Sequence, residues 1–323
     1  MRWFCMGLSF WVKSALAIGV AAAQTPVWID TDPSVAPGGH EVDDGFALIQ
    51  AFHSKEIAIR GVSVVFGNAP LSTALPIART LLGLLDPGGL KPYAGAAGAS
   101  QLGEPTPASR ALAAALRKEK LTILAIGPLT NVATVLQTNP ELAGQIERIV
   151  AVAGRRPDQH FTVGTRNGHP LRDFNFEMDP EAFQAILDSK VPLVLAPWEI
   201  SSKVWLNASD LENLKGRGAA LDWLYGPAAD WLALWHKSFG ADGFNPFDTL
   251  AVAVVVAPSL ITCETLPVRI QTLPDDVSPR ESKPYLLLSR NLDSKRSATY
   301  CYEAKPGFKS DLMRRLLGVQ VSN

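Results

Sequence analysis

Four aspartates near the start of the chain have the residue type and spacing of a metal-binding site. They lie in two short segments, Asp30-Thr31-Asp32-Pro33 and Val42-Asp43-Asp44-Gly45. Close carboxylates repel one another unless a cation lies between them, and hard cations such as Ca²⁺ or Mg²⁺ prefer oxygen ligands. For any single aspartate, an acidic turn or a helix cap is the simpler explanation. Because four carboxylates fall within fifteen residues, the sequence favours a metal site.

A strand and a helix are predicted to position these aspartates. The short apolar run from Val27 has the pattern of a buried strand that ends at Asp30 or Asp32. From Asp44 onwards apolar residues recur at helical spacing, and carboxylates favour the positive end of a helix dipole. Such a unit places the carboxylates at the C-terminal edge of a sheet, where open α/β folds have their sites.

Strands and helices alternate along most of the chain. Further strands are predicted over residues 57–66, 121–126, 148–154 and 191–196. Helices are predicted over residues 71–85, from 132, and over 221–239. This alternation predicts an α/β fold with an open, mostly parallel, Rossmann-like sheet and helices on both faces. Residues 91–110 are predicted to be a loop, and residues 264–323 to be strands or a hairpin followed by a short terminal helix.

The composition is that of an ordinary globular protein. Of the 323 residues 47% are hydrophobic and 19% are charged, and the net charge is −1. These values exclude a disordered or fibrous chain. Since the sequence has no run of Lys and Arg, we expect no nucleic-acid partner.

Residues 1–23 have the pattern of a signal peptide. Arg2 precedes a mostly apolar run to Val20, and the following alanines fit a small-residue cleavage site. Lys13 interrupts the apolar run, which argues against a stable membrane anchor. We therefore expect an exported protein, periplasmic or secreted, with one mature domain over residues 24–323.

Two cysteines, Cys263 and Cys301, would remain in the mature chain. An oxidising compartment would allow them to pair, but sequence alone leaves their separation open. There is no C-x-x-C and no zinc-like spacing, so neither cysteine is predicted to be catalytic.

The acidic segments resemble the amino-terminal signature of the calcium-dependent nucleoside hydrolases. In that family a Gly and one further residue follow the Pro, whereas here nine residues, Ser34–Val42, separate Pro33 from Asp43. Four later segments resemble the family in the same order. They are Gly67-Asn68, Gly127-Pro128-Leu129-Thr130-Asn131, the segment from Asn167 to Ala182 that ends in Asp179-Pro180-Glu181-Ala182, and Asn245-Pro246-Phe247-Asp248 with the apolar helix that follows.

The resemblance implies the roles of individual residues. It implies a Ca²⁺ ion held by Asp32, Asp44, Asp248 and the backbone carbonyl of Thr130. It also implies contacts with the ribose from Asp43, Asn68, Asn167, Asp173 and Asn175. Asp173 replaces the Glu of the family and is one methylene shorter, so its contact with the ribose 5′-hydroxyl would need a water molecule or a movement of the loop.

Aromatic residues are candidates for contact with the base. The helix predicted over residues 221–239 carries several of them, and core or subunit-interface packing is the simpler explanation. The alternative is that Trp235 and His236 close over the base. Phe247 stands where the family has a His, and the aromatic residue of purine-preferring members is thought to stack on the base there. The leaving-group proton would then come from His40, His236 or water, or stacking on Phe247 and Trp235 would make the purine ring easier to protonate.

Together these resemblances imply hydrolysis of the N-glycosidic bond of ribonucleosides, with purine nucleosides favoured, in nucleoside salvage. A Ca²⁺-bound water activated by Asp32 as general base would attack through an oxocarbenium-like state. The family also implies a homo-oligomer, a dimer or tetramer. Two alternatives stay open: a non-catalytic nucleoside- or ribose-binding protein on the same fold, and a Mg²⁺-dependent phosphohydrolase using Asp30 and Asp32. The latter leaves Pro33 and the Asn-rich loop unexplained.

Overall fold

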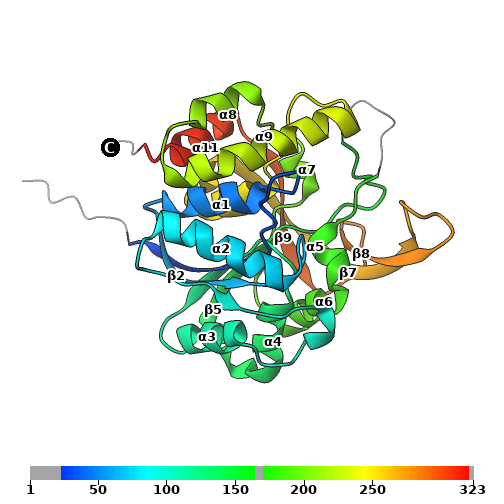
Figure 1. The fold of residues 1–323 in the computed structure, drawn as a ribbon. Helices are drawn as coiled ribbons and strands as arrows, with labels where there is room; N and C mark the ends of the chain where they lie inside the picture. Colours follow the sequence, from blue (N-terminus) through cyan, green and yellow to red (C-terminus); the bar gives the residue numbers. More distant parts are fainter. Residues whose placement is uncertain (1–22, 164–169, 320–323) are drawn as a thin grey trace, which may run out of the picture.

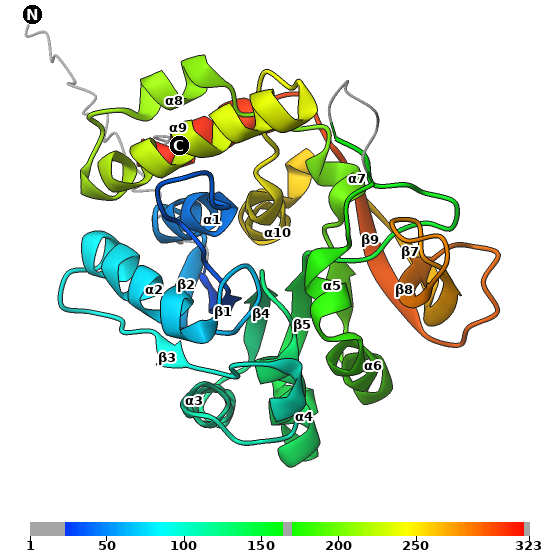
Figure 2. The same ribbon diagram turned by 45° about the vertical axis from the view of Figure 1, so that its right-hand side comes forward.

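A mixed sheet with helices on both faces forms the body of the protein (Figures 1 and 2). The computed structural model describes residues 23–163 and 170–319. Within these residues nine strands lie in the order β3-β2-β1-β4-β5-β6-β9-β7-β8. The strands are β1 (Thr25–Thr31), β2 (Ile57–Val64), β3 (Tyr93–Ala94), β4 (Leu121–Ala125), β5 (Ile146–Ala151), β6 (Leu193–Leu195), β7 (Ile261–Pro274), β8 (Ser282–Leu288) and β9 (Ser297–Ala304). Only the pairs that include β7 are antiparallel, so the predicted mostly parallel sheet is confirmed.

Helices cover the sheet in three groups, which Figure 2 separates clearly. One face carries α1 (Asp43–Phe52), α2 (Leu71–Leu85) and α10 (Phe247–Val256). The other face carries α3 (Pro107–Leu116), α4 (Thr130–Thr138) and α6 (Pro180–Ser189). Lying over α1 and α10 is a further layer of α8 (Ala208–Leu214), α9 (Ala219–Phe239) and α11 (Phe308–Leu316). The short helices α5 (Phe174–Met178) and α7 (Trp198–Ser201) follow β5 and β6 in the chain.

Strand β1 lies in the middle of the parallel part, between β2 and β4. Its side chains alternate between two cores: Val27 and Ile29 pack with the α1 and α10 side, and Trp28 packs with the α3 and α4 side. The chain moves outward from β1 to β2 and β3, and then crosses to β4 on the other side. Such a reversal of strand order opens a crevice at the carboxyl ends of the strands.

The prediction of a loop over residues 91–110 was wrong in part. This stretch contains β3 and the start of α3. Thr106 and Ser109 form a reciprocal capping box, and Pro107 occupies the first helical position. The Gly- and Pro-rich residues before Thr106 hid this helix start. The helix predicted over 71–85 is confirmed as α2, and the helix predicted from residue 132 begins two residues earlier, at Thr130.

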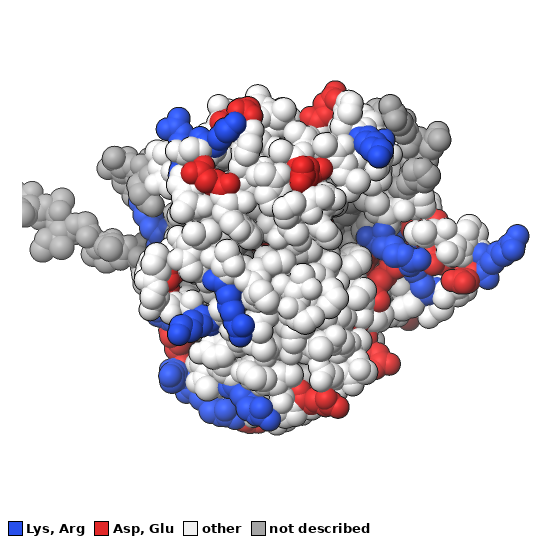
Figure 3. All heavy atoms as spheres, viewed as in Figure 1, with Lys and Arg blue, Asp and Glu red and all other residues white. Residues whose placement is uncertain are grey.

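The predicted signal peptide lies almost entirely outside the described residues, so it stays a prediction. Among the described residues, no helix has both the length and the apolar character needed to cross a bilayer. On the face shown in Figure 3, acidic and basic side chains are interspersed over a largely uncharged surface.

A disulfide joins Cys263 on β7 to Cys301 on β9, which answers the question left open by the sequence. The two residues are direct partners in the antiparallel ladder, and the bond closes a sequence separation of 38 residues. A bond of this span removes entropy from the unfolded chain.

Replacing both cysteines with alanine should lower the free energy of unfolding by about 3 kcal/mol, because the unfolded chain regains the freedom that the disulfide removed. Urea unfolding of the oxidised protein and of the double variant measures the difference. Dithiothreitol should destabilise the oxidised protein and leave the variant unchanged. Equal midpoints for the two proteins would contradict the expectation.

Candidate functional site

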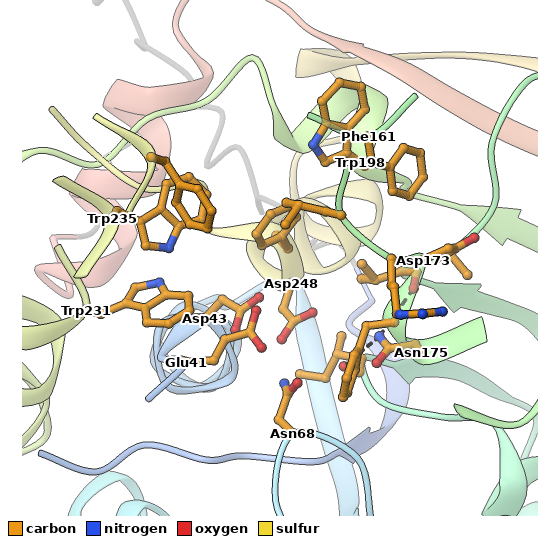
Figure 4. A pocket seen from close by; sticks show the side chains of 18 residues that line it. Glu41, Asp43, Asn68, Phe161, Asp173, Asn175, Trp198, Trp231, Trp235 and Asp248 are labelled. Atoms are coloured by element: carbon orange, nitrogen blue, oxygen red, sulfur yellow. Dashed lines mark hydrogen bonds between the residues drawn. The ribbon is translucent and has the colours of Figure 1, made fainter. Parts of the chain in front are cut away.

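A cavity of about 250 Å³ lies at the carboxyl ends of the central strands. Figure 4 shows three kinds of side chain around it. Carboxylates come from Glu41, Asp43, Asp173 and Asp248, and amides come from Asn68 and Asn175. Aromatic rings make up much of the remaining wall: Phe161, Phe174, Trp198, Trp231, Trp235, Phe239 and Phe247.

Three buried carboxylates converge beside this cavity. One oxygen each from Asp43, Asp44 and Asp248 lies within 4.8 Å of the other two. Asp43 and Asp44 open α1, and Asp248 is the second residue of α10. Because α1 packs against α10, the positive ends of both helix dipoles support the same negative cluster. Asp248 was predicted to cap α10, which was wrong: Pro246 occupies the cap position, so Asp248 is free to face the cluster.

Asp32 lies next to the cluster, at the end of β1. Its Oδ2 accepts a hydrogen bond from the Asn68 backbone N–H at 2.8 Å, and its Oδ1 has no hydrogen-bond partner. Two glycines make room for it: an added Cβ would lie 1.9 Å from Oδ2 at Gly67 and 2.9 Å from Oδ1 at Gly127. Gly67 and Gly127 are therefore required by the close approach of Asp32. Asp44 Oδ1 accepts the Asp32 backbone N–H at 3.1 Å, which ties the two segments together.

The electrostatics of the cluster favour binding of a positive charge among the carboxylates. Burial raises the pKa of Asp32, Asp43 and Asp248 well above 3.8, and the neighbouring carboxylates raise these pKa values further. Burial likewise raises the pKa of Asp44 to about 6. Oxygens of Asp43 and Asp248 are buried without a hydrogen-bond partner. A set of unpaired carboxylate oxygens fits a hard divalent cation such as Ca²⁺.

These pKa values predict a pH-dependent effect of Ca²⁺ on stability. The folded-state pKa of Asp44 lies above its ordinary value, so the metal-free folded protein binds more protons than the unfolded chain between about pH 4 and pH 6. This contribution to the free energy of unfolding is full below pH 4 and is lost as the pH rises through 6, by about 1.4 kcal/mol per pH unit. A bound cation reverses the loss because it needs the ionised form.

The rise in melting temperature produced by 1 mM Ca²⁺ should accordingly be larger at pH 7 than at pH 5. Calorimetry with Ca²⁺ and with EGTA at both pH values measures this rise. The titration of groups outside the cluster affects both samples equally, so it cancels when the EGTA value is subtracted. The expectation fails if Ca²⁺ stabilises the protein equally at the two pH values.

The predicted metal ligands and the cluster overlap in part. Asp44 and Asp248 were predicted as ligands and belong to it, while Asp43, predicted to contact the ribose, also belongs to it. Asp32 is adjacent rather than one of the three. The Thr130 hydroxyl donates to Asp179 Oδ2 at 2.5 Å, and the role of the Thr130 backbone carbonyl as a ligand stays a prediction.

Several predicted sugar-binding residues line the cavity. Asp173 precedes α5, and its Oδ2 accepts the Gly154 backbone N–H at 2.8 Å. Burial raises the pKa of Asp173 to about 7. Asn175 donates to the carbonyls of Ile126 and Val152, at 3.3 and 3.2 Å, which fixes α5 to the ends of β4 and β5. Asn68 also lines the cavity, whereas Asn167 lies outside the described residues.

Trp235 and His236, both considered for contact with the base, differ in their position relative to the cavity. Trp235 is buried in the cavity wall, and its ring centroid lies 6.4 Å from that of Phe247. His236 does not line the cavity: its side chain is 68% exposed and pairs with Asp242 at 3.2 Å. Adjacent residues of a helix point about 100° apart, so only one of the two can face inward. The residue that shares the face of Trp235 is Trp231, four positions earlier.

Sequence reasoning missed Glu41, Trp231, Phe161 and Trp198, which all line the cavity. Glu41 had a signal, because it stands two residues before the Asp pair. Phe161 and Trp198 stack at a centroid distance of 5.1 Å, a contact between segments that no local pattern indicates. His40, considered as a proton donor, is exposed and does not line the cavity.

Known proteins similar to this chain agree on one family. The family model described as "Inosine-uridine preferring nucleoside hydrolase" matches residues 27–295. The chain is 30% identical over 266 residues to the pyrimidine-specific ribonucleoside hydrolase RihA of Citrobacter koseri, covering 73% of this chain and 81% of that protein. Two solved structures share the fold. A plant nucleoside hydrolase has a TM-score of 0.75 and 21% identity, covering 91% of this chain and 99% of its own. A purine-preferring ribonucleoside hydrolase from Gardnerella vaginalis has a TM-score of 0.73 and 20% identity, covering 91% and 99%.

Proposed function

The chain belongs to the inosine-uridine preferring nucleoside hydrolase family, and from this we propose that it hydrolyses the N-glycosidic bond of ribonucleosides with the help of Ca²⁺. Family membership makes it a glycosidase-type hydrolase. The observation that carries the proposal is the convergence of Asp43, Asp44 and Asp248 beside a cavity lined with amides and aromatic rings. These parts suit a ligand that has a polar sugar and a planar base.

Calcium is the cation we propose for the cluster. Asp44 and Asp248, which converge with Asp43, would hold it, and we propose Asp32 and the Thr130 backbone carbonyl as further ligands. All of these donors are oxygens, and three of the carboxylates, Asp32, Asp43 and Asp248, have an oxygen left unpaired by the protein. When bound, the ion supplies charge that orients a diol and makes water a better nucleophile.

Residues of the chain then perform the remaining steps. Asp32 has an unpaired Oδ1 and a raised pKa, so it is suited to accept the proton of the attacking water as general base. Asp43, Asn68, Asp173 and Asn175 would orient the ribose through its hydroxyls. The carboxylates around the anomeric carbon stabilise the positive charge that develops there in the transition state.

The base would lie against the aromatic part of the wall. Trp231, Trp235 and Phe247 lie with neighbouring ring centroids 6.0 and 6.4 Å apart. Their combined area supports our proposal that purine nucleosides are preferred over pyrimidine ones. The relatives are divided on this point, because the RihA proteins are named pyrimidine-specific and the G. vaginalis enzyme is titled purine-preferring.

We also propose that the chain works outside the cytoplasm. The Cys263–Cys301 disulfide supports this, because such bonds persist mainly in oxidising compartments.

The test of the proposed activity is ribose release by purified residues 24–323 from inosine, guanosine, adenosine and uridine, with Ca²⁺ or with EGTA. Ca²⁺-dependent release is expected, fastest with the purine nucleosides. Binding of nucleosides without release of ribose would instead indicate a binding protein on the same fold.

A further inference from the structure

The insertion Ser34–Val42 folds onto helix α9. The Gly38 backbone N–H donates to Asp230 Oδ2 on α9 at 2.8 Å. Gly39 also lies against α9, where an added Cβ would come within 3.3 Å of the Leu234 Cβ. Asp230 and Leu234 are the residues just before Trp231 and Trp235, which line the cavity. The insertion is therefore fastened to the same helix that supplies the aromatic wall.

This arrangement brings Glu41, near the end of the insertion, into the cavity. Figure 4 shows its carboxylate beside that of Asp43 and below the ring of Trp231. The Ser34 hydroxyl donates to the Glu41 backbone carbonyl at 3.2 Å, which holds the loop and leaves the side chain directed into the cavity. Glu41 thus lies between the carboxylate cluster and the aromatic wall.

Acidic side chains outnumber basic ones around the described part of the cavity. Four carboxylates line it: Glu41, Asp43, Asp173 and Asp248. Among the described lining residues the one basic side chain is Arg172, which pairs with Glu177 at 2.7 Å. Arg172 precedes Asp173, which Figure 4 shows across the cavity from Trp231 and Trp235. Beyond the residues proposed to hold the cation, the aromatic end of the described cavity therefore has the Glu41 carboxylate and no basic side chain beside it.

This inequality matters for the departure of the base. A neutral base takes the electron pair of the glycosidic bond and leaves with negative charge unless it is protonated, and a nearby carboxylate opposes that charge. A heterocycle that is already cationic at the glycosidic nitrogen leaves as a neutral molecule and needs no proton. Aromatic faces and a carboxylate together are also the groups that attract a cationic ring.

We propose that the favoured substrates are ribosides of a cationic nitrogen heterocycle, with Glu41 as the residue that selects the positive charge. The inference rests on the proposed hydrolase activity. In the reaction water adds to C1′, the C1′–N bond breaks, and its electron pair neutralises the ring nitrogen. The proton of the water passes to Asp32 and then to solvent. The products are ribose, a neutral heterocycle and one proton, so no further reactant is needed.

The experiment compares nicotinamide riboside, a permanent pyridinium cation, with inosine, uridine and p-nitrophenyl β-D-ribofuranoside. The last substrate is neutral and its leaving group needs no acid, so it reports the sugar and water chemistry alone. Each is assayed with the wild type, with Glu41→Gln and with Glu104→Gln, an exposed control. Nicotinamide riboside should have a higher kcat/KM than inosine and uridine. Glu41→Gln should lower that value about tenfold, while cleavage of p-nitrophenyl riboside, whose leaving group departs as an anion, should not fall.

Two results would overturn the selectivity. One is a kcat/KM for inosine or uridine above that for nicotinamide riboside. The other is an equal loss of kcat/KM for all substrates in Glu41→Gln. Glu41→Ala is the second variant if Glu41→Gln folds poorly. If p-nitrophenyl riboside itself is not cleaved, the hydrolase activity fails, and this outcome is distinct from a failure of charge selection alone.

Discussion

Replacement of Asp32 by asparagine is expected to lower kcat for ribose release by about 10³-fold, the scale of a lost general base. Asparagine keeps the shape and can still accept the Asn68 backbone N–H, so the loop after β2 should stay in place. What disappears is the basic oxygen, Oδ1, which no protein donor occupies. The measurement is kcat for inosine at saturating Ca²⁺.

The same variant should be more heat-stable than the wild type in EGTA. Burial and the charge of Asp44 raise the pKa of Asp32, so removing this carboxylate relieves repulsion in the metal-free protein. Asp188→Asn, at an exposed position of α6, is the matched control and should change neither property. A variant that is inactive and also clearly less stable in EGTA would show that Asp32 mainly supports the fold.

Replacement of Asp248 by asparagine should weaken Ca²⁺ binding by about 100-fold, because the cluster loses one of its three converging negative charges. Activity measured at low Ca²⁺ should fall accordingly. At Ca²⁺ concentrations high enough to refill the site, most of kcat should return, which separates a ligand from a general base. Isothermal titration calorimetry gives the affinity, and a Ca²⁺ titration of ribose release gives the rescue.

Asp210→Asn serves as the control for Asp248. Asp210 is also a buried aspartate in the first turn of a helix, where it completes the capping box of α8 and pairs with Lys309 at 2.7 Å. Its loss should cost some stability without changing Ca²⁺ affinity. Unchanged Ca²⁺ affinity in Asp248→Asn would remove Asp248 from the metal site.

Much of the fold was predictable because it depends on local patterns. The buried run at Val27–Asp30 and the amphipathic run at Leu71–Leu85 have the periods of a strand and a helix, and the structure has β1 and α2 there. The start of α3 was missed because its signal is a short capping box inside a stretch rich in Gly and Pro. The antiparallel end of the sheet depends on the pairing of β7 with β8 and β9. The local residue pattern of a strand does not show which other strand it pairs with.

The sequence by itself determined the chemical groups and their family. It indicated the carboxylates around Asp32 and Asp44, the Gly67-Asn68 and Gly127-Pro128 turns, and the absence of a His at Phe247, because each of these is a matter of residue type and near neighbours. Only the tertiary structure decided which distant groups meet. It packs α1 against α10 so that Asp248 reaches Asp43, turns Trp235 inward and His236 outward, and pairs Cys263 with Cys301. It also folds the insertion onto α9 and so adds Glu41 to the cavity. These outcomes depend on packing between segments far apart in the chain, which local residue patterns do not encode.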